Sequence, residues 1–349
     1  MKKIEFGLIS FGDAAPETGK TGIHANQRIH NLLEEIKFAD DLGIDVFGLG
    51  EHHRSDFAVS SPATVLAAAA AVTKKIKLTS AVTVLSSDDP VRVYQQFATL
   101  DLISEGRAEI MAGRGSFLES FPLFGYSLQD YESLFAEKLA LLLEINKSAT
   151  LSWKGTHRAS INNLGIYPRA LQEQIPVWLA AGGTPSSAVR AANLGLPLIL
   201  AIIGGIPEQF KGFVNLYKKT ALQNGTKEED LQLGINNHML IGEDSEQTAN
   251  AFFPHYAQMM DRVGRDRGWQ PMSRTQYDFM RSPNGSLMVG NVQEVTEKIL
   301  LEYRLFGFTR FMAQASLGYL PHALTMKSIE LFATKVIPEV KRRIANMEV

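Results

Sequence analysis

Apolar and polar positions alternate along the chain in two rhythms, one typical of buried strands and one typical of helices. Residues 4–10, IEFGLIS, form the first apolar strand-like run. In the segment after the next polar loop, apolar residues recur every three or four positions and form one stripe: Ile29, Leu32, Leu33, Ile36, Ala39 and Leu42. The stripe stops at Gly43, a typical helix terminator, and residues 44–50 are again apolar. This pattern predicts a strand, a helix and a second strand.

The same unit recurs to the end of the sequence. Ser61 with Pro62, and Asp89 with Pro90, are typical capping and first-turn residues at the start of two further helices. A helix-like segment follows each predicted strand, and the strands occupy residues 4–10, 44–50, 75–85, 107–115, 176–183, 196–203, 231–242 and 308–314. Most of these strands are apolar throughout, which is expected when both faces of a parallel sheet are buried.

The repeat predicts an α/β fold, a (β/α)8 TIM barrel. An open doubly wound sheet is the alternative, but it would carry a glycine-rich phosphate turn after the first strand, and SFGDAAPETGK (10–20) lacks that pattern. A barrel needs roughly 250 residues, so about 100 must lie in insertions. We expect residues 1–349 to form one domain, with insertions near 115–130, 151–168 and 261–286 at the carboxyl-terminal face of the strands.

Composition narrows the class of protein. Lys and Arg total 35 against 37 Asp and Glu, so the net charge of −2 gives no reason to expect nucleic acid or an anionic membrane as a partner. The absence of cysteine excludes disulfides and thiolate chemistry. Residues 1–10 do not form a signal peptide, and no apolar run approaches the roughly 20 residues of a membrane span. We therefore expect a soluble, cytoplasmic protein.

Residues at the carboxyl ends of barrel strands face the active site, and Glu51, His52 and His53 follow the second strand. Adjacent side chains on extended backbone point to opposite sides, which disfavours chelation of a metal by both histidines, and we expect no metal site. One imidazole is either a structural group paired with Glu51 or a general base in the pocket. The residues alone leave these two interpretations open.

Two further segments suggest an anion site. Arg114 lies between two glycines after the fourth strand, where backbone can approach a ligand closely. After the fifth strand, Gly182 and Gly183 precede Thr184, a natural helix cap, and Ser187 lies in the first turn. The unpaired N–H groups of such a helix start bind phosphate. Together the segments suggest a phosphate cradle, although each also fits an ordinary loop or cap.

In this order, four segments resemble the bacterial luciferase-like family of flavin-dependent monooxygenases: GLGEHHRSDF (48–57), the run from Ser80 to Gly115, the run from Gly182 to Ile203, and VGNVQEVTEKI (289–299). The resemblance implies an eight-stranded parallel barrel. It also implies FMN in its reduced form, with the phosphate held by Arg114, Thr184 and Ser187 and by backbone near Gly182 and Gly183. It further implies proton transfer at His52, and a non-proline cis peptide between Ala81 and Val82 against which the isoalloxazine ring packs.

Two departures from luciferase itself matter. Gly113 stands where luciferase has a cysteine, which argues against light emission, and the 261–286 segment looks unlike the corresponding mobile loop, so the substrate pocket does not transfer.

The resemblance therefore predicts a two-component FMN-dependent monooxygenase that acts on paired donors. Reduced FMN from a separate, transiently bound flavin reductase and O2 would oxygenate a small organic substrate, and the family favours a homodimer. The alternatives are a deazaflavin-dependent hydride-transfer enzyme and a non-catalytic flavin-binding protein.

Overall fold

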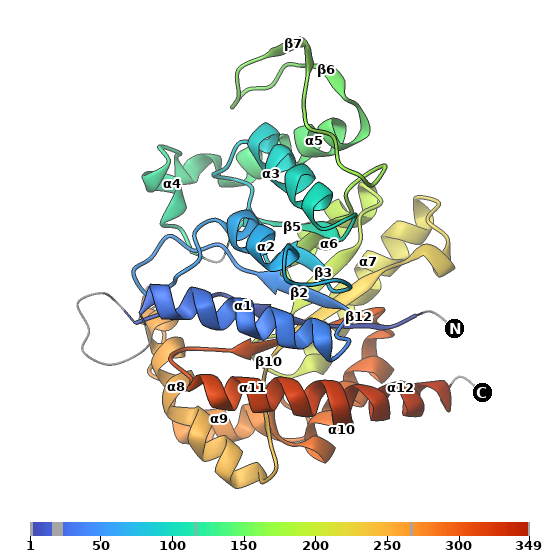
Figure 1. The fold of residues 1–349 in the computed structure, drawn as a ribbon. Helices are drawn as coiled ribbons and strands as arrows, with labels where there is room; N and C mark the ends of the chain where they lie inside the picture. The colour runs from blue at the N-terminus through green and yellow to red at the C-terminus, as the bar shows by residue number, and fades with distance from the viewer. Residues whose placement is uncertain (1–2, 16–23, 116, 266–267, 348–349) are drawn as a thin grey trace.

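The computed structural model describes residues 3–15, 24–115, 117–265 and 268–347. Within these ranges, eight parallel strands close into a barrel, and helices surround it (Figure 1). The strands of the barrel are β1 (Glu5–Ser10), β2 (Val46–Leu49), β3 (Lys77–Ser80) continued by β4 (Thr83–Val84), β5 (Ala108–Gly113), β8 (Val177–Ala181), β9 (Leu198–Ala201), β10 (Leu233–Gly242) and β12 (Arg310–Ser316). β12 pairs with β1, which closes the ring and confirms the predicted barrel.

Helices connect the strands as the apolar stripes predict. They are α1 (Ala25–Asp41), α2 (Pro62–Ala70), α3 (Pro90–Ile103), α4 (Ser120–Leu123), α5 (Tyr131–Lys147), α6 (Pro185–Asn193), α7 (Lys211–Gln223), α8 (Ser245–Arg265), α9 (Arg274–Arg281), α10 (Val292–Phe306), α11 (His322–Leu331) and α12 (Ile337–Ala345). Phe332–Val336 forms a π-helical turn that joins α11 to α12. Among the described residues, no helix is long and apolar enough to cross a membrane.

The barrel interior is closed at its amino-terminal end by buried charge. Arg310 is 1% exposed and donates to Glu109 at 2.6 and 3.0 Å and, through Nε, to Glu5 at 2.9 Å. Its guanidinium lies over the ring of Trp178, 4.1 Å from the centroid. Above this floor, an apolar layer fills the interior: Ile9, Val46, Ala81, Met111, Trp178, Ile199 and Met312. A ligand can therefore enter only from the carboxyl-terminal end of the strands, the barrel mouth.

The three predicted insertions have different origins. Residues 115–130 contain α4 and a short 3-10 turn, and residues 261–286 contain the end of α8 and all of α9; residues 116 and 266–267 lie outside the described chain. Residues 151–168 contain the antiparallel hairpin β6 (Thr150–Trp153) and β7 (Ile161–Gly165). This hairpin follows helix α5 rather than a strand, which corrects the expectation that every insertion leaves the carboxyl-terminal face.

The hairpin nevertheless folds back along the outside of the barrel. Its tip donates backbone N–H groups of Thr156 and His157 to Glu137 of α5, and Arg158 binds Asp89 at the start of α3 at 2.7 Å. Figure 1 shows it projecting beyond α5.

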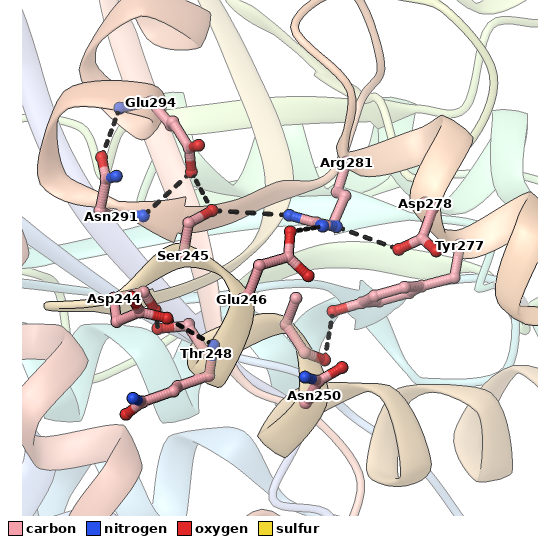
Figure 2. Close-up of polar contacts among 12 residues, drawn as sticks. Asp244, Ser245, Glu246, Thr248, Asn250, Tyr277, Asp278, Arg281, Asn291 and Glu294 are labelled. Carbon is pink, nitrogen blue, oxygen red and sulfur yellow. Dashed lines mark hydrogen bonds and ion pairs between the residues drawn. The ribbon is translucent and has the colours of Figure 1, made fainter.

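The segment between β10 and β12 is larger than a simple helix. α8 and α9 precede a short strand, β11 (Met288–Asn291), which pairs with the end of β10, and α10 then returns the chain to β12. Arg281 on α9 contacts Ser245 and Glu246 of α8 as well as Asp278, and Ser245 donates to Glu294 of α10 (Figure 2). The insertion has its own apolar cluster, which includes Phe252, Tyr256, Tyr277, Met280, Leu317 and Leu320.

Candidate flavin site

The loops after β1 and β2 pair with each other beside the barrel mouth. The N–H of Ala14 donates to the carbonyl of Asp56 at 3.0 Å, and the N–H of Ala58 donates to the carbonyl of Gly12 at 2.8 Å. The backbone N–H of His52 donates to the carbonyl of Val59, also at 3.0 Å. These bonds fix the backbone that carries His52 without using its side chain.

Three phenylalanines surround the imidazole of His52. The ring centroids of Phe57, Phe11 and Phe117 lie 4.2, 4.7 and 5.0 Å away. Phe11 also packs against the interior layer, so His52 lies next to the mouth. Burial, reinforced by His53 and Arg54, lowers the pKa of His52 to about 3. Its buried Nε2 has no hydrogen-bond partner among the described residues. His52 is therefore neutral at pH 7, with one ring nitrogen that no described residue engages.

Of the two imidazoles, that of His53 is the one paired with Glu51. Oε1 of Glu51 lies 2.9 Å from Nε2 of His53, and its Oε2 accepts the backbone N–H of Val84 at 2.9 Å. The hydrogen bond to Glu51 raises the pKa of His53. Glu51 and His53 thus hold β4, and the carboxylate of Glu51 does not orient His52.

The predicted flavin platform lies on the third barrel strand, between β3 and β4. The Ala81–Val82 peptide bond is cis, as the resemblance implies. Both side chains pack with the interior layer. A Cβ atom on Gly113 would lie 2.7 Å from a methyl group of Val82, so any larger residue at this position would require Val82 to move.

The cradle segments meet at the start of α6. Nη2 of Arg114 donates to Oγ of Ser187 at 3.2 Å, and Thr184 caps α6 without a side-chain hydrogen bond to it in the described chain. Gly183 has a φ of +105°, which only glycine adopts easily. A Cβ atom on Gly182 would meet no described atom within 4 Å. These five residues, the α6 cradle, thus place the open space at Gly182 next to the start of a helix and a guanidinium, a combination that fits a phosphate.

Two charged residues beside the α6 cradle were not predicted from the sequence. Glu132 at the start of α5 forms an ion pair with Arg114 and accepts a 3.0 Å hydrogen bond from Arg190 of α6. Arg190 lies one helical turn after Ser187, a spacing that places both on one face of a helix and offered a signal. Nothing in the sequence pairs Glu132 with them.

The opposite side of the mouth carries buried polar groups that were also missed. Strand register aligns Ile9, Gln314 and His238, and Ile9 belongs to the interior layer, so all three face the barrel interior. Nε2 of Gln314, Nδ1 of His238 and the hydroxyl of Tyr256 are buried without a partner among the described residues. Burial lowers the pKa of His238 to about 4. The sequence did contain one signal for these polar groups, because a histidine and a glutamine lie within otherwise apolar strands.

Comparison with known proteins places this fold and site in a family. The model of the luciferase-like monooxygenase family matches residues 4–310. N-acetyl-S-alkylcysteine monooxygenase of Bacillus subtilis (strain 168) is 27% identical over 212 residues, which cover 60% of this chain and 58% of that protein.

Two solved structures share the fold over nearly the whole chain. The oxygenating constituent of 3,6-diketocamphane monooxygenase from a Pseudomonas putida plasmid, solved in complex with FMN, has a TM-score of 0.76 at 19% identity, covering 97% of this chain and 98% of that one. An F420-dependent secondary alcohol dehydrogenase bound to an F420–acetone adduct has a TM-score of 0.75 at 17% identity, covering 97% and 99%.

The chain therefore belongs to the luciferase-like monooxygenase family. Membership supports a flavin-dependent oxidoreductase, and these structural neighbours include both an FMN and an F420 protein.

Proposed function

We propose that this protein is a two-component, FMN-dependent monooxygenase that oxygenates a small organic substrate. The observation that carries the proposal is the α6 cradle, where Arg114, Ser187 and the start of α6 border the open space at Gly182. The site would hold reduced FMN with its phosphate in this cradle and its ring against Ala81 and Val82. The bound flavin would supply the electrons for O2, so that one oxygen atom enters the substrate and the other leaves as water.

The chain's own residues would position and protect this chemistry. The neutral imidazole of His52 would accept or donate a proton through Nε2, because no protein group engages that atom in the described chain. Phe11, Phe57 and Phe117 would exclude water around it.

The test is a titration with oxidised FMN, anaerobically reduced FMN and F420, comparing the wild type with Arg114→Ala. Arg158→Ala is the control, because Arg158 binds Asp89 on the outside of the barrel. We expect the tightest binding for reduced FMN, and a loss of about 10- to 100-fold in Arg114→Ala only, since charge-assisted hydrogen bonds contribute about 1.5–3 kcal/mol. No binding of any flavin would refute the proposal.

F420-dependent hydride transfer is the second candidate, and Arg190 is the observation that favours it. A longer acidic cofactor tail needs more than one basic group, and Arg190 supplies a second guanidinium joined to Arg114 through Glu132. Preference for F420 over FMN in the same titration would select this candidate. A third candidate, a flavin carrier without turnover, would be supported if His52→Ala left both flavin binding and all flavin-dependent activity unchanged.

A homodimer, a transient flavin reductase and a cytoplasmic location complete the proposal. Val72, just after α2, and Leu102 and Ile103 on α3 are between 46% and 49% exposed, and a second copy would cover such apolar side chains. Light scattering after size-exclusion chromatography tests the dimer. Coupled assays with and without an NADH:flavin reductase test the second component.

A further inference from the structure

One carboxylate lies between two guanidinium groups beside the α6 cradle. Glu132 forms an ion pair with Nη1 of Arg114 through Oε1, and its Oε2 accepts a hydrogen bond of 3.0 Å from Nη2 of Arg190. The other terminal nitrogen of Arg114 reaches Ser187. Glu132 thus occupies donors that a phosphate held at Ser187 would also use.

The two arginines favour the ionised form of Glu132. Partial burial raises the pKa of Glu132, but hydrogen bonds and charge from Arg190 and Arg114 outweigh burial and lower it. The first turn of α5 also favours an acidic side chain. Glu132 is therefore ionised at neutral pH and acts as the counter-ion of the two arginines.

The bridge is nevertheless displaceable. The side chain of Glu132 is 55% exposed, whereas those of Arg114 and Arg190 are 18% and 23% exposed. Exposed ion pairs contribute little to stability, so the carboxylate can turn to solvent while the arginines stay in place. Arg114 is further held over the ring of Tyr131, 5.4 Å from its centroid.

Charge decides what displaces it. The two arginines and Glu132 sum to +1, since +2 and −1 combine, whereas a terminal phosphate monoester carries about −1.5 to −2. With Glu132 turned away, the two arginines match that monoester. A phosphodiester carries only one negative charge, so it compensates the two arginines less well and displaces Glu132 less readily.

We propose that Glu132 is a specificity-determining residue for the cofactor. It competes with the bound anion for Arg114 and Arg190, so that a compact terminal phosphate displaces it and a cofactor with a longer acidic tail is disfavoured. This inference rests on the proposed function, because it assumes that a flavin phosphate occupies the α6 cradle. It assigns the discrimination between FMN and F420 to a residue outside the cradle itself.

The experiment measures the dissociation constants of FMN, riboflavin and F420 for the wild type and Glu132→Gln. Removing two exposed ion pairs with a competing charge should tighten FMN about 3- to 10-fold and F420 by a larger factor. Riboflavin, which has no phosphate, should change less than about twofold. The affinity of the variant for FMN should also fall more steeply with salt, because the site then carries +2.

Glu144→Gln is the matched control on the same helix, since Glu144 pairs with Lys147 far from the cradle, and it should change nothing. If Glu132 instead served to position the arginines, Glu132→Gln would weaken FMN, and the inference would be overturned. Equal changes for FMN and riboflavin, or no change in the FMN-to-F420 ratio, would overturn it as well while the proposed function stands. Absence of FMN binding in every protein would overturn both.

Discussion

The two sides of the barrel mouth are built in opposite ways. The side between β3 and α6 consists of glycines, backbone N–H groups and partly exposed arginines, and its central Gly182 is surrounded by open space. On the side of β10 and β12, His238 and Gln314 are buried, with Tyr256 of the insertion packed against His238. The first side is the one where we propose that an anion binds, and its open space and partly exposed charges cost the fold little stability. The second is part of the folded core and depends on the insertion that covers it.

The largest expected effect comes from removing the insertion's central aromatic ring. Tyr256 is fully buried, with the rings of Phe252, Tyr277 and His238 centred 5.4 to 5.7 Å away. Tyr256→Ala should lower the free energy of unfolding by about 3–5 kcal/mol, as large-to-small aromatic substitutions do. Urea denaturation measures this loss.

The same variant tests whether the two sides are independent. FMN affinity of folded Tyr256→Ala should stay within about twofold of the wild type, because the α6 cradle lies on the opposite side of the mouth. Tyr256→Phe is the control, since it removes only the unpaired hydroxyl. A tenfold loss of FMN affinity in Tyr256→Ala would show that the two sides are coupled.

The regions around the barrel mouth also share one property, because buried histidines, His52 and His238, should each lose their contribution to stability in acid. The folded-state pKa values of His52 and His238, about 3 and 4, lie below the unfolded value of about 6.5. These two imidazoles therefore bind more protons in the unfolded chain than in the folded one below pH 6.5, and the stability that they contribute falls as the pH falls. Each histidine should cost about 2 kcal/mol at pH 5 relative to pH 7.5.

Urea denaturation between pH 5 and pH 7.5 tests this expectation. His238→Gln should recover about half of the loss that the two histidines cause, and His30→Gln, on the exposed face of α1, is the control for replacing a histidine by glutamine. If the difference in stability between the wild type and His238→Gln does not change between pH 7.5 and pH 5, His238 accepts a proton in the folded state, and the expectation is wrong.

The contrast also explains what the sequence could predict. The barrel and the meeting of Arg114 with Ser187 follow from short segments whose residues act locally: apolar runs, glycines and a helix start. The cis peptide at Ala81–Val82 was expected from the family resemblance alone. Each signal lies within a few residues of its effect, and strand order in a barrel then brings the segments together.

Other features depend on packing between distant segments, and the sequence could not predict them. Glu132 looks like any exposed acidic residue until α5 lies beside α6. The partners of Tyr256 come from α9 and β10, and the course of the hairpin depends on Glu137 and Asp89. Hydrophobic periodicity predicts elements, but it carries no information about which exposed charges meet across them.

Two neighbouring glycines offer a sharper test of the cofactor side. Gly182→Ala should leave stability unchanged, because its Cβ meets no described atom within 4 Å, yet the methyl group would occupy the space next to the start of α6. We expect about tenfold weaker FMN binding, equivalent to about 1.4 kcal/mol. Gly183→Ala should instead destabilise the fold by about 1–3 kcal/mol, because of its φ of +105° and a 3.2 Å contact with Phe210. Unchanged FMN affinity in Gly182→Ala would mean that the phosphate binds at another place.

The smallest expected effect has the opposite sign and concerns the buried side. Gln314 is 1% exposed, and its Nε2 has no partner in the described chain. Gln314→Leu keeps most of the volume and removes an unpaired buried group, so it should be neutral or stabilise the fold by up to about 1 kcal/mol. Gln314→Ala, the control for volume, should destabilise it through a cavity. Urea denaturation of both variants separates the two contributions.

If the leucine variant is less stable than the wild type by more than about 1 kcal/mol, the amide of Gln314 is hydrogen-bonded in the folded protein. Its position beside His238 then serves the stability of the fold. If the leucine variant is as stable as the wild type or more stable, the unpaired amide of Gln314 costs the wild-type protein stability. A role in ligand binding at the barrel mouth would then explain why a glutamine is present there.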